Sequence, residues 1–457
     1  RDFCLSRGLG DVYKRQGYCR ILGLLYSEKR CIMKSYTIKQ LSELSGLNRK
    51  EIRKHLIAQT LKNEVRSGKY FINEEDLNVW LENPTILDEN NLDSIFNEEN
   101  EEIIMEDGIY EKDISKCVKT IDWKNVPLNT IKFADFFCGA GGISLGLLMA
   151  GYEPVLGVDI NDSASETYRK NLGSRFEKLN NLSAKDITKK DVKEEIIQKL
   201  RNENVKLICG GFPCQGFSLS GSRVISDPRN TLYKDMLEIV NEVRPEFIVM
   251  ENVVGITTIY DGKVLKKIIS DYNKIGYEIS WQEINAADFE VGQSRKRIIF
   301  IGNCANKRNI FPKKLIEDPT KYVTCGDVIE KYKNMKEDKS INHIFSKHSD
   351  TMKKRLLAVQ VGKSLYPNYG DSWKKCPMDK PSCTIKGNHG ATNIHYELAR
   401  VITPREMAAL QSFPDDYIFY GSKHDILVQI GNAVAPYVAR AIGLALKEEI
   451  LKEINED

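Results

Sequence analysis

The stretch from Ile131 to Leu148 constrains the fold of this chain more than any other. A strand-like apolar run, Ile131–Phe137, leads directly into Cys138–Gly142, a turn with three glycines, and apolar residues then recur at helical spacing. A strand, a glycine turn and a helix in this order are how a doubly wound sheet brings backbone amides close to a ligand. The sequence therefore predicts an α/β fold built on a doubly wound sheet.

A second strand-like run, Pro154–Val158, ends at Asp159, whose carboxylate is placed to accept hydrogen bonds from ribose hydroxyls. The glycine turn is short and lacks the full G-x-G-x-x-G phosphate cradle. This favours a nucleoside ligand without a pyrophosphate. A dinucleotide remains the alternative on the residues alone.

An isolated cysteine, Cys214, stands in a turn that follows another buried strand, Val205–Cys209. The turn begins Gly210-Gly211-Phe212-Pro213, and its two glycines let a substrate approach the thiol. A lone Pro-Cys is more often a tight turn with a buried thiol. Here two further segments supply the polar groups that a nucleophilic thiol acting on a base requires.

The first of these segments is Phe247–Met250, a buried-strand run with Glu251 at its carboxyl end, the edge of an α/β sheet where ligands bind. The second is Gln293-Ser294-Arg295-Lys296-Arg297, which precedes the strand Ile298–Ile301. Alternation in an extended segment predicts that the two arginines share one face.

These stretches, in this order, resemble the cytosine-C5 DNA methyltransferases of bacterial and phage restriction–modification systems, from about Ile131 to about Leu446. The resemblance implies a Rossmann-like sheet, S-adenosyl-L-methionine as cofactor, and methylation of cytosine C5 within a short site in double-stranded DNA. It implies that Cys214 adds to C6 of a flipped-out base, because a thiolate at C6 makes C5 electron-rich. Glu251 would contact N3 and the exocyclic amine. Of Arg295 and Arg297, one would donate to O2, for which Arg297 is favoured, and the other would order the loop or a phosphate.

The resemblance also assigns binding residues, with no metal ligands among them. The cofactor residues that it implies are Phe137, Cys138, Gly139, Ala140, Gly141, Gly142, Asp159, Ile160, Asp186, Ile187, Pro213, Asn432 and Val434. Asp186 is equally placed to cap the helix that follows. The DNA contacts that we expect are Ser218, Ser220, Arg223, Arg229, Asn252 and Gln293. Four further DNA contacts are expected in the N-terminal part: Arg49, Lys50, Arg53 and Lys54.

The N-terminal part reads as a small DNA-binding module. Thr37–Gln40 and Asn48–Glu51 are capping boxes that each open a short helix, and Val65–Ile72 follows as a hairpin, or wing. Between Lys34 and Lys69, nine Lys and Arg face three Glu, which suits phosphate contacts. The module resembles excisionase or MerR-type winged helix-turn-helix domains. A protein-interaction bundle with a basic face is the alternative.

The charge reverses after this module, where residues 86–115 hold eleven Asp and Glu against one Lys; such a segment is typical of a flexible linker. We expect these parts: a non-native or disordered leader at 1–32, the winged helix-turn-helix at 33–83, the acidic linker at 84–128, the catalytic and cofactor-binding domain at 129–302, a target-recognition domain at 303–391, and a return to the catalytic domain at 392–457.

The predicted recognition domain lacks a regular α/β pattern. Its His343, His348, Tyr366, Tyr369 and Trp373 are mixed with basic residues, as expected of a segment that faces DNA. After this domain, a capping box at Thr403–Glu406 predicts the start of a helix. The resemblance implies that this helix supports the recognition domain. A last helix from Pro436 carries an apolar face of Val438, Ala439, Ile442 and Leu446.

Composition fits this interpretation without proving it. A chain with 41% hydrophobic and 29% charged residues is an ordinary globular protein, and the net charge of +3 is too small to argue for nucleic acid by itself. Eleven cysteines without a C-x-x-C pair argue against a zinc site or a disulfide framework, and for a reducing cytosol. We expect a cytoplasmic monomer in a bacterial or phage-infected cell, with no membrane partner and with a cognate restriction endonuclease as genetic partner.

Two rival functions use the same residues. A tRNA cytosine-C5 methyltransferase is disfavoured by the N-terminal module and by the lack of a Cys-Phe-Thr tripeptide. A catalytically inactive DNA-binding regulator is disfavoured because Cys214, Glu251, Arg295 and Arg297 are all present.

Overall fold

The computed structural model describes two units of the chain, residues 1–112 and 113–457. In the second unit it describes residues 121–179, 185–213, 232–366, 373–387 and 393–452. In the first it describes only 33–36, 41, 44–45, 64–66 and 69–73.

The described part of the first unit contains a three-stranded antiparallel sheet in the order β1-β3-β2. Strands β2 (Glu64–Arg66) and β3 (Lys69–Asn73) pair where the sequence predicts a hairpin, with Val65 opposite Tyr70. The sequence did not predict β1 (Met33–Tyr36), which pairs with β3. Most of the predicted helix-turn-helix, including Arg49, Lys50, Arg53 and Lys54, lies outside the described residues.

A six-stranded sheet organises the second unit, in the order β5-β4-β6-β7-β9-β8. Its strands are β4 (Lys132–Phe136), β5 (Glu153–Val158), β6 (Leu207–Gly210), β7 (Phe247–Val253), β8 (Glu278–Asn285) and β9 (Lys296–Asn303). Strands β4, β5, β6 and β7 are parallel to one another, whereas β9 is antiparallel to both β7 and β8. The predicted doubly wound sheet is therefore present, with an antiparallel edge.

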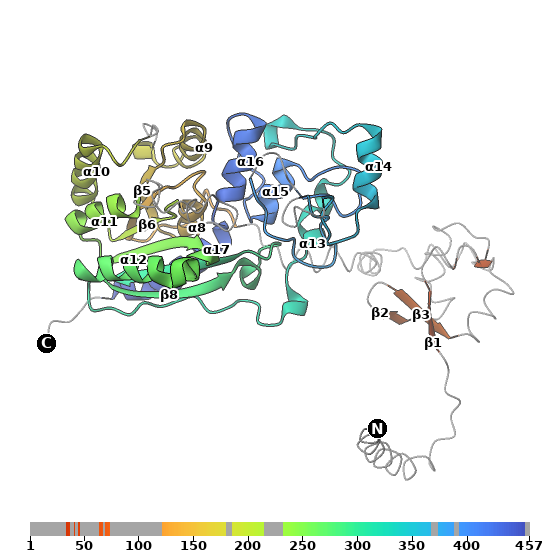
Figure 1. Ribbon diagram of the computed structural model, residues 1–457, viewed down its shortest axis with the longest axis horizontal. Coiled ribbons are helices and arrows are strands. Elements are labelled where there is room, and N and C mark those ends of the chain that lie inside the picture. Colours follow the sequence, from red (N-terminus) through yellow and green to blue (C-terminus); the bar gives the residue numbers. More distant parts are fainter. Residues whose placement is uncertain are drawn as a thin grey trace, which may run out of the picture. The chain divides into compact units, whose positions relative to one another are not determined.

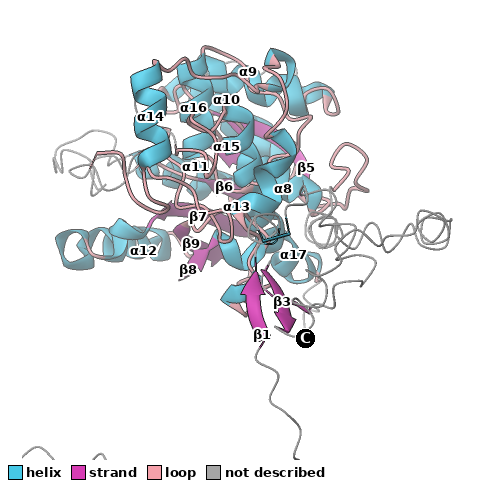
Figure 2. Ribbon diagram, turned by 90° about the vertical axis from the view of Figure 1, so that its right-hand side faces the viewer, coloured by secondary structure: helices cyan, strands magenta, loops and turns pink. Residues whose placement is uncertain are grey.

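Helices cover both faces of this sheet because its strands alternate their side chains. Phe136, Ile208 and Ile248 belong to one core with α10 (Lys190–Asn202), α11 (Leu232–Val243) and α12 (Lys263–Lys274). Phe133 and Leu207 belong to the opposite core with α8 (Gly142–Met149) and α17 (Pro436–Leu451). The apolar face that we predicted for the last helix is buried there, which confirms it. Figure 2 shows the strands enclosed by helices.

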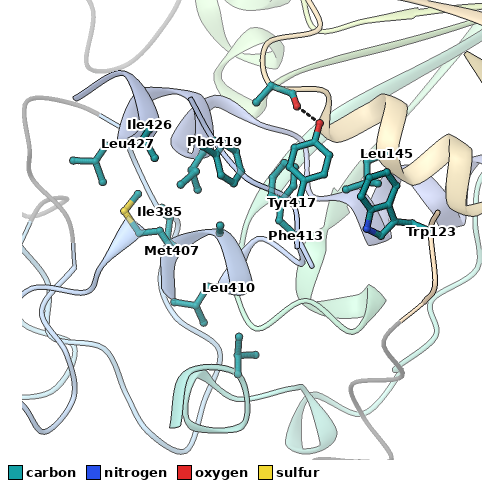
Figure 3. Close-up of a cluster of buried hydrophobic side chains, with 14 of the residues drawn as sticks. Trp123, Leu145, Ile385, Met407, Leu410, Phe413, Tyr417, Phe419, Ile426 and Leu427 are labelled. Carbon is teal, nitrogen blue, oxygen red and sulfur yellow. Dashed lines mark hydrogen bonds between the residues drawn. The ribbon is translucent and has the colours of Figure 1, made fainter. Parts of the chain in front are cut away.

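Four of the remaining described α-helices pack around a third core beside the sheet (Figure 1). They are α9 (Asp162–Leu172), α13 (Cys325–Ile329), α15 (Pro404–Leu410) and α16 (Lys423–Asn432). Helix α14 (Asp350–Ala358) contributes no residue to this core. The predicted capping box of α15 forms, with Thr403 and Glu406 bonding reciprocally. Trp123 is 2% exposed in this core (Figure 3). Residues from Ile121 thus pack with the catalytic unit, although the boundary at 128 placed them in the linker.

Among the described residues, one helical stretch, Lys423–Leu451, has the length and hydropathy of a membrane span. It consists of the two helices α16 and α17, and 72% of its apolar window is buried inside the protein. The apolar character of this stretch therefore serves the core.

Candidate active site

The turn between β4 and α8 presents bare backbone at the carboxyl end of the sheet. Phe137, Gly139 and Gly141 have positive φ angles of 55°, 52° and 86°, which glycine adopts without steric cost. A Cβ added to Gly139 would meet no described atom within 4 Å, so open space lies beside the turn. Cys138 is buried in the turn, and this burial raises the pKa of its thiol well above the usual value.

Asp159, directly after β5, ties the glycine turn to α9. Its Oδ2 accepts the N–H of Gly139 at 2.9 Å and its Oδ1 accepts the N–H of Asn161 at 2.8 Å. Burial raises the pKa of this carboxyl above its ordinary value. Each carboxylate oxygen retains acceptor capacity for a ribose hydroxyl. Ile160 is 70% exposed and offers an apolar surface for a planar base. The open turn, the acid and the exposed isoleucine together fit a nucleoside cofactor.

The C-terminal segment returns to this turn. A Cβ on Gly142 would lie 2.2 Å from the carbonyl oxygen of Val434, so a side chain at Gly142 would displace backbone. The residue at the end of α16, Asn432, is exposed. Tyr417 donates its hydroxyl to the carbonyl oxygen of Ala140 at 2.5 Å (Figure 3). The structure thus brings Gly142 and Val434 together as predicted, and adds Tyr417, which the sequence analysis missed.

Asp186 lies near the end of β5, since the N–H of Lys185 donates to the carbonyl of Asp159 at 2.8 Å. Oδ1 of Asp186 accepts the N–H and the hydroxyl of Thr188 at 3.0 and 2.7 Å, and these bonds lower the pKa of Asp186. These bonds close a turn before α10, whose N-cap is Lys189 without a side-chain cap, so Asp186 does not cap that helix as the alternative predicted. Ile187 is buried in the core. The cofactor contacts of both residues stay predictions.

Glu251 and Arg297 form an ion pair at the edge of the sheet where β6 has ended. Arg297 Nε lies 2.9 Å from Glu251 Oε1, and the two side chains are 19% and 12% exposed. β7 continues through Glu251 to Val253 because β9 pairs with it there, with Val253 opposite Arg297. A Cβ on Gly211 would lie 3.2 Å from Glu251 Oε2. The second carboxylate oxygen therefore faces the turn that leads to Pro213.

Asn252 fixes the start of that turn. Its side-chain amide donates to the carbonyl oxygen of Phe212 at 3.2 Å, and its Oδ1 accepts the N–H of Val253 at 2.9 Å. Asn252 is only 2% exposed, so in this conformation it holds backbone, and its expected DNA contact stays a prediction. Pro213 is half-buried at the end of the described segment. Cys214, Ser218, Ser220, Arg223 and Arg229 lie outside the described residues.

Residues 293–297 alternate as predicted: Gln293 and Arg295 are buried and Arg297 is half-buried, whereas Ser294 and Lys296 are exposed. Arg295 donates to the carbonyl oxygens of Ile385 and Gly431 at 3.2 and 3.0 Å. Burial lowers the pKa of its guanidinium well below the usual value, and Arg297 adds to this effect.

The side chain of Gln293 has no exposed surface. It donates to Gln411 Oε1 at 2.9 Å and accepts the N–H of Ile385 at 2.7 Å. This geometry does not favour the DNA contact expected of Gln293. The sequence places Gln411, with Leu410 and Phe413, in the motif expected to support recognition, but it did not predict the contact with Gln293.

In the predicted recognition domain, His343 does not face DNA as expected: it is fully buried, and its Nδ1 lies 3.0 Å from Thr403 Oγ1. The reason is that the segment around it packs against the N-terminus of α15. His348, Tyr366 and Trp373 are half-buried in an aromatic cluster, with ring centroids 6.5 and 6.1 Å from Trp373. Arg355 lies over the ring of Tyr366, 5.5 Å from its centroid. Tyr369 lies outside the described residues.

A doubly wound sheet with an open glycine turn after β4, an acid after β5 and an acid–arginine pair between β7 and β9 fits the S-adenosylmethionine-dependent methyltransferase class. Within that class, residues 131–448 match the C-5 cytosine-specific DNA methylase family. The chain belongs to this family: it is a DNA cytosine-5 methyltransferase, and its cofactor is S-adenosylmethionine.

Known relatives agree with this assignment. The chain is 36% identical to the type II methyltransferase M1.HphI of Haemophilus parahaemolyticus, over 69% of this chain and 87% of the relative. It is 32% identical to M.NgoFVII of Neisseria gonorrhoeae, over 70% of this chain and 87% of the relative. Among solved structures, a putative DNA modification methyltransferase encoded within an E. coli prophage is 25% identical, with a TM-score of 0.57, and the match covers 70% of this chain and 100% of that one.

Proposed function

We propose that this methyltransferase works through a covalent bond between Cys214 and cytosine C6. The thiolate adds to C6, and the electron pair displaced from the C5–C6 double bond makes C5 nucleophilic. C5 would then take the methyl group from the sulfonium of bound S-adenosylmethionine, with cleavage of the bond between sulfur and methyl and S-adenosylhomocysteine as the leaving group. Loss of the C5 proton to a base, for which water is our candidate, restores the double bond and expels the thiolate. The observation that carries this proposal is the Glu251–Arg297 ion pair facing Gly211, three residues before Cys214.

The ion pair supplies what the adduct requires. Addition of the thiolate places negative charge on the ring, which a proton at N3 and a cation at O2 stabilise. Glu251 is proposed to contact N3 and the exocyclic amine through the oxygen that faces Gly211, and Arg297 to donate to O2. Both groups are mostly buried, and a low local dielectric strengthens their interactions.

Other residues hold the reactants. Asn252 holds the backbone of Phe212, which precedes Pro213 and Cys214 in the chain. The glycine turn, Asp159, Ile160, Asn432 and Val434 are proposed to hold S-adenosylmethionine, which supplies an electrophilic methyl group when bound. From the sequence, Ser218, Ser220, Arg223 and Arg229 are proposed to contact DNA as the target base leaves the stack.

We further propose that the enzyme acts on a short site in double-stranded DNA in the cytoplasm, as the partner of a restriction endonuclease. Residues 303–391 would choose the site, and the N-terminal module would bind DNA separately. Bisulfite sequencing of DNA from cells that express the protein tests the reaction. We expect protected cytosines within one short sequence. Unprotected cytosines throughout would refute the proposed function.

A further inference from the structure

The stretch Ser382–Gly387, here called the crossing segment, passes along the residues that precede β9. The N–H of Ser382 donates to the carbonyl of Gly292 at 2.9 Å, and the N–H of Ser294 donates to the carbonyl of Ser382 at 2.8 Å. The hydroxyl of Thr384 donates to the carbonyl of Ser294 at 2.9 Å. The end of the predicted recognition domain is thus bonded directly to the segment that continues into Arg295 and Arg297.

Arg295 joins the crossing segment to α16. Its guanidinium donates to the carbonyls of Ile385, in the crossing segment, and Gly431, in the last turn of α16. The side chain is 4% exposed, and its Nε has no hydrogen-bond partner among the described residues. A buried, incompletely bonded charge is weak evidence for a role in stability, because a well-packed apolar residue often does as well. This arrangement points to a role beyond stability.

A second connection runs parallel to the first. Gln293 accepts the N–H of Ile385 and donates to Gln411, and Gln411 donates to the carbonyl of Ile430 at 2.9 Å. Gln293 and Gln411 are both fully buried. Both Arg295 and Gln293, which precede β9, therefore connect the crossing segment to the end of α16. Arg295 does so directly, and Gln293 does so through Gln411.

The crossing segment and α16 are in close backbone contact, with no room for a side chain at two glycines. A Cβ on Gly431 would lie 2.0 Å from the backbone nitrogen of Gly387, and a Cβ on Gly387 would lie 2.5 Å from Val428 Cα. Closely packed elements transmit displacement because they have few alternative arrangements. If the crossing segment moves, α16 must therefore move with it. If α16 stays in place, it prevents the crossing segment from moving.

The segments that Arg295 connects belong to parts of the protein with different proposed roles. The crossing segment ends the predicted recognition domain. Arg297, two residues after Arg295, pairs with Glu251. Beyond Gly431, the chain reaches Val434, whose carbonyl abuts Gly142 at the cofactor turn. The guanidinium of Arg295 thus lies where recognition, catalysis and cofactor binding converge.

We propose that Arg295 is a positioning residue that couples DNA recognition to cofactor binding, through its bonds to Ile385 and Gly431. The inference rests on the proposed function, since it takes residues 303–391 as the DNA reader. DNA bound there fixes the crossing segment, and Arg295 and Gln293 pass that constraint to the end of α16 and the cofactor turn.

The test is the affinity for S-adenosylhomocysteine, measured by calorimetry with and without a short duplex that carries the site mapped by bisulfite sequencing. For the wild type we expect the duplex to tighten binding by about 5- to 150-fold, the usual range for coupled sites. The coupling ratio is the affinity for S-adenosylhomocysteine with the duplex divided by the affinity without it. Arg295→Met is expected to bring this ratio close to one, while the affinity without DNA changes little. Gln411→Met, which breaks the second connection without touching a charge, should lower the ratio as well and serves if Arg295→Met does not fold.

Arg405 provides a matched control. It is also fully buried, and its Nε also has no hydrogen-bond partner among the described residues, although it lies 4.0 Å from Asp415 Oδ1. Its guanidinium donates to the carbonyls of Asp415 and Tyr417 at 3.0 and 3.1 Å, and both residues follow it closely in the chain. Arg405→Met should lower the melting temperature yet keep the wild-type ratio. An Arg295→Met or Gln411→Met protein with the wild-type ratio, or a wild type that methylates DNA but shows no coupling, would overturn the inference. A wild type that methylates no cytosine would instead refute the proposed function.

Discussion

Arg297 Nε lies 2.9 Å from Glu251 Oε1, across a strand pair in which Val253 is opposite Arg297. The antiparallel pairing of β9 with β7 places the two charges together at the edge of the sheet. Removing one partner would leave the other charge unpaired in a mostly buried position, which is costly. The pair is therefore a preorganised feature of the fold, present without substrate.

Glu251→Gln keeps the size and a hydrogen-bonding end, so we expect a folded protein that still binds cofactor. Loss of the carboxyl at N3 should slow single-turnover methyl transfer by about 10²-fold or more, the scale of a lost general acid. Glu283→Gln is the control, because Glu283 also pairs with a cation, Lys296, at 2.8 Å on the neighbouring strand. Equal rates for wild type and Glu251→Gln would make Glu251 structural.

Asp159→Ala removes the carboxylate that anchors the glycine turn and is proposed to bind the ribose. We expect cofactor affinity to weaken by about 1–3 kcal/mol, the cost of leaving polar partners unsatisfied. Asp162→Ala, an exposed aspartate in the first turn of α9, should bind as the wild type does. Calorimetry that finds unchanged affinity in a folded Asp159→Ala protein would remove Asp159 from the site.

Asp135, buried below the glycine turn, gives a prediction on pH. Burial raises its pKa to about 7, against a partial opposing effect of the hydrogen bond from Ser144 at 2.7 Å. Between the unfolded pKa near 4 and about 7, the folded protein binds a proton that the unfolded chain does not. Asp135 therefore lowers the free energy of unfolding as pH rises through that window, by at most about 1.4 kcal/mol per pH unit.

Asp135→Asn removes this titration. We expect the variant to gain melting temperature relative to the wild type at the high end of the window, and to gain less or nothing at the low end. Thermal unfolding of both proteins across the window makes the comparison. A difference that does not change with pH would mean that Asp135 does not titrate there.

The N-terminal module is proposed to bind a separate DNA site, the operator of its own modification genes. A protein that begins near Lys116, which keeps the buried Trp123, should methylate the same sequence with similar turnover. The segment from Met33 to Glu82 should bind DNA by itself, with affinity falling steeply as salt rises. Gel shifts and footprints on both fragments check this. Loss of sequence preference in the shortened enzyme, or no binding by the segment at low salt, would contradict it.

Local patterns predicted much of this fold. The run Ile131–Phe137, the glycine turn and Asp159 are set by neighbours in sequence, and the structure has β4, the turn and the end of β5 there. The alternation of buried and exposed side chains in residues 293–297 could also be predicted, because side chains alternate between the two faces of any extended segment.

Contacts between distant segments could not be predicted in the same way. Glu251 lies within β7, and not at its end, because β9 pairs with it from far along the chain. The carbonyl partners of Arg295 are 90 and 136 residues away, and no residue type marks a backbone carbonyl. The burial of His343 likewise depends on α15, which follows it by about 60 residues.

The covalent role of Cys214 is the central claim, and trapping on modified DNA tests it most directly. With 5-fluorocytosine at the target, C5 has no proton to lose after methyl transfer, so the bond between sulfur and C6 should persist. We expect the wild type and Cys304→Ser, a half-buried cysteine outside the site, to give a cofactor-dependent complex that survives denaturation, and Cys214→Ser to give none. An equal amount of complex with Cys214→Ser, or none with the wild type, would contradict the account.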